Sequence, residues 1–352
     1  MHTIAVAGHI CVDLWPRVDA RTLLAPGRII EVGPLAMTLG GPVGNTGRAL
    51  MALGVDARAV TCVGDDGLGE FVRATLAAEG RSTAGLRTIP GASTSYSLIL
   101  ESPGLDRTIW HNVGANAEFD GAGIDLDGVD LLHVGYPPLL PALLGDNGKP
   151  LADMLAGARA AGITTSVDLA VVDPQSPVAR LDWERILAAM AAQADVLTPS
   201  LDDLTSALRI EQPYSADLAE HLAGRLIEWG SAVVALSAGE HGLFVRTASA
   251  GRLSDAGRAF TGRSSAWADR RMYLPPLWTA EPVTTLGAGD ACSAGLLYGL
   301  AVGADVEDAV RLAAACAAAA VSGRHTTPGA ICDLRPDLAP LFDPPLNDAT
   351  RP

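Results

Sequence analysis

The order of apolar segments along the chain is the feature that most limits how it can fold. Short apolar runs alternate with Ala- and Leu-rich stretches of helical spacing over most of the 352 residues. This alternation is typical of a parallel sheet that is covered by helices on both faces, so we expect a doubly wound α/β fold. The predicted strands are 3–7, 57–62, 131–134, 164–167, 196–198, 232–237 and 242–246, and the predicted helices are 45–53, 68–78, 151–161, 186–192, 216–229, 290–299 and 306–321.

Two segments interrupt this order because they contain strand-forming runs without a helix between them. We expect residues 14–39 and 93–111 to form a small antiparallel β lid at one edge of the core. An exposed edge of such a lid favours a homodimer. The strands expected in the lid include 29–32, 35–38, 95–100 and 108–110, and the core is expected to comprise 1–13, 40–92 and 112–352.

A third irregular segment, residues 246–280, is rich in Arg, Ser and Gly. Because this composition is typical of surface connections, the sequence predicts a long surface loop there.

The charge of the chain restricts its partners. The 40 acidic residues exceed the 25 Lys and Arg, which gives a formal net charge of -15. An acidic surface repels nucleic acid and anionic membranes within a Debye length of about 10 Å. The longest apolar run, residues 312–321, is also shorter than the roughly 20 residues of a membrane-spanning helix. We therefore expect a small-molecule ligand, no nucleic acid and no membrane.

The cysteines favour a reducing compartment. An odd number of cysteines without a C-x-x-C pair does not suit a disulfide framework. Residues 1–13 also lack the basic region of a signal peptide. We expect a cytoplasmic protein in which five cysteines are small buried apolar residues: Cys11, Cys62, Cys292, Cys316 and Cys332.

The strongest chemical motif is Gly287-Ala288-Gly289-Asp290, which directly precedes a helical run at 291–297. Glycines before a helix leave its first backbone N–H groups accessible, and the helix dipole adds positive potential, so this is a site suited to phosphate. A carboxylate at the same place would repel phosphate unless it serves as a base for an attacking hydroxyl. The other interpretation is an N-cap Asp after a glycine turn. The motif alone leaves both open.

A second group of residues suits the binding of hydroxyl groups. Gly40 and Gly41 allow close backbone approach to a ligand, and Asn45 offers both a donor and an acceptor. Asp13, placed by the pattern at the end of the first strand, is expected where ligands bind in open α/β sheets. Each of these residues also fits a simple turn or cap.

The order of the motifs resembles the ribokinase-like (PfkB) carbohydrate and nucleoside kinases. The stretch from Gly40 through Asn45 and Gly54 to residues 64–69 is similar to their first signature, and Gly287-Ala288-Gly289-Asp290 to their second. Between these, residues 114–116, 195–203 and 236–242 follow the order of the family, so the resemblance covers nearly the whole chain.

The resemblance implies an enzyme that transfers the γ-phosphoryl group of ATP, with Mg²⁺, to a hydroxyl of a sugar, a sugar derivative or a nucleoside. It implies that Asp290 is the general base and that Gly287, Ala288 and Gly289 form an anion hole. The acceptor-binding positions would be Asp13, Gly40, Gly41, Asn45 and Asn116. The nucleotide-binding positions would be Ser200, Ser237, Gly239 and Gly242.

The sequence departs from the family pattern in the residues that organise cations. The usual N-x-x-E appears as Ser200 to Asp203, where Asp203 keeps the charge that would act on Mg²⁺ through water. Thr284 replaces the Asp that usually opens the second signature. The glycine that the family has in the following cation-binding loop is not clearly matched near 322–325, which argues against a monovalent cation. Asp168, after a predicted strand, is either a phosphate or metal contact or a solvated loop residue.

A sugar is the favoured acceptor because aromatic residues that could stack on a base are few in the expected lid: Trp15, Tyr96 and Trp110. A nucleoside kinase and a catalytically silent ligand-binding relative are the alternatives.

Overall fold

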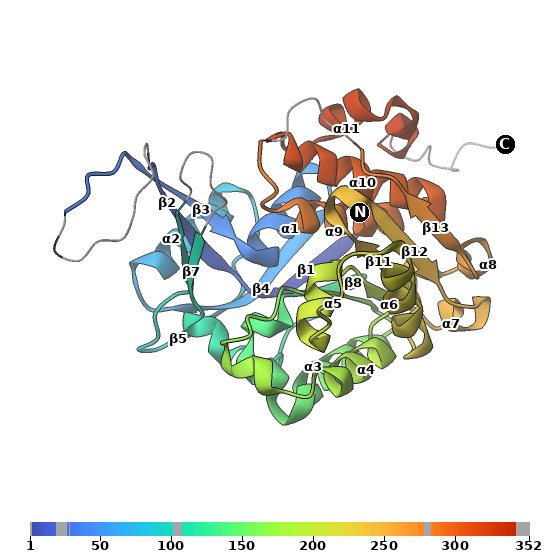
Figure 1. The fold of residues 1–352 in the computed structure, drawn as a ribbon, viewed down its shortest axis with the longest axis horizontal. Helices are drawn as coiled ribbons and strands as arrows, with labels where there is room; N and C mark the ends of the chain where they lie inside the picture. Colours follow the sequence, from blue (N-terminus) through green and yellow to red (C-terminus); the bar gives the residue numbers. More distant parts are fainter. Residues whose placement is uncertain (1, 19–26, 28, 101–107, 278–282, 343–352) are drawn as a thin grey trace.

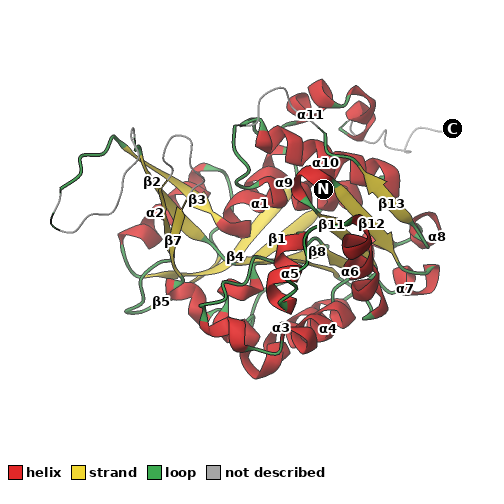
Figure 2. Cartoon of the chain, in the orientation of Figure 1, coloured by secondary structure: helices red, strands yellow, loops and turns green. Residues whose placement is uncertain are grey.

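The computed structural model describes residues 2–18, 27, 29–100, 108–277 and 283–342. A nine-stranded sheet, with strand order β13-β12-β11-β10-β9-β8-β1-β4-β5, forms the centre of the molecule (Figures 1 and 2). Neighbouring strands of this sheet pair in parallel except at one edge, where β12 and β13 are antiparallel. This confirms the predicted mostly parallel sheet. The strands are β1 (Thr3–Gly8), β4 (Asp56–Gly64), β5 (Gly85–Ile89), β8 (Leu131–Gly135), β9 (Thr164–Asp168), β10 (Val196–Leu197), β11 (Val233–Ser237), β12 (Leu243–Thr247) and β13 (Arg271–Leu274).

Helices cover both faces of this sheet, as the alternation of segments predicts. In β1, Ile4 and Val6 contribute to the core on one face, and Ala5 and Ala7 contribute to the core on the other. The helices of the first face are α1 (Gly41–Ala52), α2 (Gly67–Ala78), α9 (Ala288–Val302), α10 (Val306–Val321) and α11 (Pro328–Leu334). Those of the second are α3 (Gly145–Ala160), α4 (Trp183–Gln193), α5 (Leu201–Leu208) and α6 (Ala216–Glu228). No described helix has both the length and the apolar character needed to cross a bilayer.

A separate four-stranded sheet, β3-β2-β6-β7, projects from one end of the core and corresponds to the predicted lid (Figure 1). Its outer pairs are antiparallel, as predicted, whereas the central pair of β2 and β6 is parallel. The predicted strand at 29–32 is wrong: these described residues form no strand. Parts of the predicted lid, 19–26, 28 and 101–107, lie outside the described residues. The lid strands are β2 (Cys11–Pro16), β3 (Leu35–Gly40), β6 (Tyr96–Leu100) and β7 (Thr108–Asn112).

The prediction of a long surface loop at 246–280 is wrong. The described part of this segment contains α7 (Ala250–Ser254), α8 (Ser264–Trp267) and β13; residues 278–280 lie outside the described residues. Phe260 and Trp267 are fully buried and meet edge to face, with ring centroids 5.5 Å apart. These two large side chains anchor the segment to the core although the residues around them are polar.

All five cysteines are free thiols. Four of them are buried, as predicted, and Cys332 is half-buried.

Helices α9 and α10 approach each other very closely. A Cβ atom added at Gly295 would lie 2.8 Å from both the Cα of Ala313 and the carbonyl oxygen of Leu312. The glycine therefore lets the two backbones nearly touch, which fixes α9 and the residues at its amino end relative to the sheet.

This contact generates a test of stability. We expect Gly295→Ala to lower the free energy of unfolding by about 1–3 kcal/mol because the added methyl group overpacks the helix interface. The control is Gly157→Ala in α3, where an added Cβ meets no described atom within 4 Å. That variant should gain about 0.5–1 kcal/mol from reduced chain entropy. Urea unfolding measures both, and equal effects at the two positions would contradict the packing argument.

Candidate active site

Asp290 lies in the first turn of α9 with only 1% of its surface exposed. The N-cap of this helix is Gly287, which has a left-handed backbone (φ 73°), and Asp290 is the third helical residue. The interpretation of Asp290 as an N-cap is therefore wrong. Its carboxylate turns instead toward α1 and the end of β8.

Three side chains donate hydrogen bonds to the Asp290 carboxylate. Thr46 Oγ1 lies 2.9 Å from Oδ1, and Asn45 Nδ2 and Tyr136 OH lie 3.0 and 3.1 Å from Oδ2. Asn45, predicted as an acceptor contact, thus holds Asp290. Tyr136 follows β8 in a left-handed conformation (φ 61°), which is uncommon for a residue other than glycine and sets the ring toward α9.

Burial raises the pKa of Asp290, and the charge of Asp13 raises it further, whereas the bonds from Asn45, Thr46 and Tyr136 act in the opposite direction. A carboxylate with a raised pKa and three fixed donors is both oriented and able to accept a proton. This combination suits a general base.

The start of α9 borders open space. A side chain added at Gly289 would meet no described atom within 4 Å, and one at Gly287 would come no closer than 3.8 Å, to Asn45. The backbone N–H groups of the first turn have no acceptor within their own helix. The N–H of Ala288 contacts the Thr285 carbonyl at 3.4 Å, and together Gly287, Ala288 and Gly289 form an open amino end of the kind that suits an anion.

Two further carboxylates lie at the same edge of the sheet. Asp168 ends β9 and is buried, so it is not the solvated loop residue that was the alternative. Ser293 Oγ in α9 lies 3.3 Å from Asp168 Oδ2 and 2.8 Å from Thr198 Oγ1. The pKa of Asp168 is raised well above its ordinary value by burial and by the charges of Asp203 and Asp290.

Asp203 is bound by its own helix. Its carboxylate accepts the backbone N–H of Ser200 at 2.7 Å, while Ser200 Oγ accepts the N–H of Asp203 at 3.0 Å, so the pair caps α5. Burial raises the pKa of Asp203 to about 6. The capping of α5 is a structural reason for Ser at position 200 and Asp at position 203.

Oxygen donors of this kind fit Mg²⁺, which prefers carboxylates, phosphates and water. Among the described residues, no group of three or more His, Cys, Asp or Glu side chains could enclose an ion alone. Asp168 and Asp203 supply carboxylates of the kind that Mg²⁺ binds together with water and phosphate.

The predicted nucleotide-binding residues lie together at the carboxyl ends of β10 and β11. Ser200 and Ser237 form a parallel bridge, and the N–H of Ser237 bonds to the Pro199 carbonyl at 3.0 Å. Gly239 and Gly242 both have positive φ angles in the turn between β11 and β12.

The structure gives the predicted acceptor-binding residues different surroundings. Asp13 lies within β2 of the lid, so its placement at the end of the first strand is wrong. Gly40 leaves room for it, since an added Cβ would lie 2.2 Å from Asp13 Oδ2. Gly41 similarly leaves room for the ring of His9. Asn116 is fully buried and donates to the carbonyl of Ile10 at 2.7 Å, which ties the core to the start of the lid.

The sequence prediction missed Thr46 and Tyr136. Thr46 adjoins the predicted Asn45, which was the available signal. Tyr136 carries no recognisable pattern, because its role depends on an unusual backbone angle.

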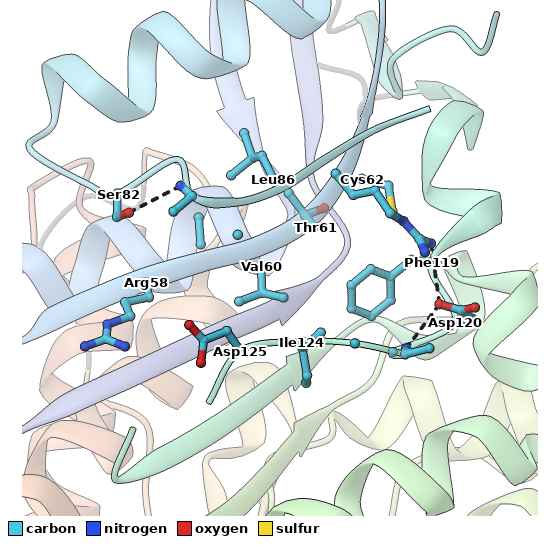
Figure 3. Close-up of a pocket in the computed structure, with 17 residues that line it drawn as sticks. Arg58, Val60, Thr61, Cys62, Ser82, Leu86, Phe119, Asp120, Ile124 and Asp125 are labelled. Carbon is cyan, nitrogen blue, oxygen red and sulfur yellow. Dashed lines mark hydrogen bonds and ion pairs between the residues drawn. The ribbon is translucent and has the colours of Figure 1, made fainter. Parts of the chain in front are cut away.

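A cavity of about 550 Å³ lies elsewhere, between β4, β5 and residues 119–125 (Figure 3). Its charged groups are already partnered: Arg87 pairs with Asp120 at 3.4 Å, and Arg58 donates to the Asp127 carbonyl at 2.7 Å. It shares no residue with the surroundings of Asp290, which remain the candidate active site.

Comparisons with known proteins identify the family and the fold. The sequence pattern described as pfkB family carbohydrate kinase matches residues 1–331. The ATP-dependent ribose-1-phosphate kinase of Halopiger xanaduensis is 27% identical over 321 residues, which are 90% of this chain and 91% of that protein. The fold is similar to Arabidopsis thaliana ribokinase complexed with ribose and ATP (TM-score 0.70, 16% identity, 95% and 98% of the two chains). It is also similar to the Methanocaldococcus jannaschii nucleoside kinase (TM-score 0.69, 17% identity, 95% and 98%).

The raised pKa of Asp203 predicts how stability depends on pH. Between its ordinary value of 3.8 and about 6, the folded state binds more protons than the unfolded state, so the free energy of unfolding falls as pH rises through this window. Asp203→Asn keeps an oxygen that accepts the Ser200 N–H but cannot ionise. In the absence of metal, we expect the free energy of unfolding of Asp203→Asn to exceed that of wild type by about 1–3 kcal/mol at pH 7.5. Near pH 4 the two free energies should be equal.

Urea unfolding at the two pH values measures this difference. The control is Asp255→Asn, an exposed residue at the end of α7, which should change little at either pH. An Asp203→Asn effect of equal size at both pH values would contradict the assignment.

Proposed function

The chain belongs to the pfkB family of carbohydrate kinases, and from this premise we propose that it phosphorylates a hydroxyl of a small sugar or sugar derivative with ATP, using Asp290 as the general base. The observation that carries the proposal is the position of Asp290. It is a buried carboxylate with three donors, beside an open helix amino end suited to phosphate.

The transfer follows from these positions. The acceptor hydroxyl loses its proton to Asp290 as its oxygen forms a bond to the γ-phosphorus of ATP. The bond between that phosphorus and the bridging oxygen breaks, and ADP leaves. Backbone N–H groups at Gly287 to Gly289 stabilise the charge that develops on the transferred group.

Asp168 and Asp203 are the residues that would hold Mg²⁺, through water, beside the phosphates. The ion would neutralise phosphate charge. Ser200, Ser237, Gly239 and Gly242 would line the nucleotide, and the departures near 322–325 leave a monovalent cation outside this proposal.

A sugar acceptor is favoured over a nucleoside by the faces of the lid. Side chains two apart on a strand share a face, so Trp15 lies on the same face as Asp13. The pairing register puts Tyr96 opposite Val12 and Trp110 opposite Leu98, which assigns both aromatic rings to the other face. Only one of the three candidate rings is therefore on the face of Asp13. A nucleoside remains the alternative acceptor.

We also propose that the enzyme acts in the cytoplasm, where its five free thiols stay reduced.

The central test of the proposal is Asp290→Asn. This variant should still bind ATP, but kcat should fall by about 10² to 10⁴ because the acceptor proton loses its base. The matched control is Asp305→Asn, which replaces the N-cap of α10 by an equally good cap and should keep full activity. ADP release with a panel of sugars, sugar phosphates and nucleosides measures turnover. Near-normal turnover of Asp290→Asn would exclude Asp290 as the base.

A homodimer through the lid completes the proposal. The register aligns Met37, Leu14, Leu98 and Trp110 in one row across all four lid strands, on the face opposite Asp13. Leu14 packs on the core, but Met37 and Trp110 in the outer strands are 36% and 45% exposed, so these two ends of the row are available to a second copy.

We expect Trp110→Lys to shift the chain from dimer to monomer, because a charge in the row opposes its burial. Light scattering during gel filtration measures the mass. Ile29→Lys is the control because this side chain is fully exposed and lies outside the lid strands. A wild-type monomer would contradict the dimer without affecting the catalytic proposal.

A further inference from the structure

Two histidines beside the candidate acceptor site have ring nitrogens without partners. His9, between β1 and β2, is 2% exposed, and neither of its ring nitrogens has a hydrogen-bond partner among the described residues. His111 in β7 uses Nδ1 to contact Ser97 Oγ at 3.1 Å, whereas its buried Nε2 has none. The two ring centroids are 5.1 Å apart.

Unpaired buried polar atoms are uncommon in folded proteins, and a group of three in one place points to a missing partner. Among the described residues, no protein group supplies this partner. The rings are too close for a group to enter between them, but a ligand hydroxyl at their edges could supply it.

The histidine pair, His9 and His111, lies between the two carboxylates that the proposed function uses. Ser97, which contacts His111, pairs with Asp13 across β2 and β6. The ring of His9 stacks on Tyr136 with centroids 6.0 Å apart, and Tyr136 OH donates to Asp290. An acceptor that is held by Asp13 and reaches toward Asp290 would therefore pass beside the histidine pair.

The chemistry of the pair indicates which part of an acceptor it contacts. Burial lowers the pKa of both rings, so both are neutral at neutral pH. A neutral imidazole has one donor and one acceptor, as a hydroxyl does, and it offers no charge to an anion. A phosphate at this point would also be repelled by the carboxylates of Asp13 and Asp290.

We propose that His9 and His111 bind free hydroxyl groups of the acceptor and select for them, rather than for a phosphate, at this end of the site. This inference rests on the proposed function, since it takes the space between Asp13 and Asp290 as the acceptor site.

The test uses variants that separate the two nitrogens of His111. His111→Asn retains a polar atom near Nδ1 for Ser97 and removes Nε2, whereas His111→Gln places a polar atom near Nε2. His9→Phe keeps the ring on Tyr136 and removes both nitrogens. The matched control is His133→Asn: His133 is fully buried, contacts Ser166 Oγ through Nδ1 at 3.0 Å and also has an Nε2 without a partner among the described residues, but it lies within β8.

Binding is measured by calorimetry with D-ribose, D-ribose 1-phosphate and inosine, in the presence of a non-hydrolysable ATP analogue. For each probe that wild type binds, we expect His9→Phe and His111→Asn to weaken affinity by about 5- to 15-fold, the loss of one or two neutral hydrogen bonds. His111→Gln should stay within about twofold of wild type, as should His133→Asn, and the melting temperatures should remain similar. A larger effect on KM than on kcat should accompany the loss.

Several outcomes would overturn the inference while leaving the kinase proposal intact. These are wild-type affinity in both His9→Phe and His111→Asn, an equal loss in His133→Asn, or a larger loss for ribose 1-phosphate than for D-ribose, which would assign the pair to phosphate. Binding of ribose 1-phosphate alone by wild type would also overturn the selection for free hydroxyl groups. If wild type binds none of the probes and releases no ADP with any acceptor of the panel, the proposed function fails, and the inference fails with it.

Discussion

The burial of the Asp290 carboxylate under three hydrogen-bond donors is the interaction on which the rest of the site depends. Its donors come from α1 and from the end of β8, so helix α9, helix α1 and the sheet must keep one relative position. The close contact of α9 with α10 at Gly295 fixes the same helix from its other side. Catalytic geometry and core packing are therefore supported by the same backbone positions.

Burying three ionised carboxylates at one edge of a sheet without counter-charges would destabilise the folded state. Asp168, Asp203 and Asp290 each have a raised pKa, and burial is the largest cause in every case. Within the described chain, the groups that bond to them are hydroxyls, amides and backbone N–H groups rather than cations. Their raised pKa values show that the ionised forms are disfavoured in the chain alone, and a cation delivered together with phosphate would favour those forms.

Much of this arrangement could be predicted because it follows from the order of residue types within short segments of the sequence. The strands and helices of the core follow from apolar periodicity, and the helix start at Gly287–Asp290 follows from its glycines. Features that depend on distant contacts could not be predicted. Tyr136 reaches Asp290 only through a left-handed backbone, Asp13 belongs to the lid because β2 begins two residues after His9, and Trp267 is hidden in a polar segment.

Two of the four junctions between the lid and the core are short. Only His9 and Ile10 separate β1 from β2, and β3 passes directly into α1 at Gly40 and Gly41. The other two junctions are residues 90–95, before β6, and Val113, after β7, so a rotation of the lid would be absorbed at all four. Such a hinge would carry the imidazole of His9 with it and pull on the helix that holds Asn45 and Thr46. Domain closure and alignment of the reactive groups are then one mechanical event, and a lid transplanted from another enzyme would disturb both.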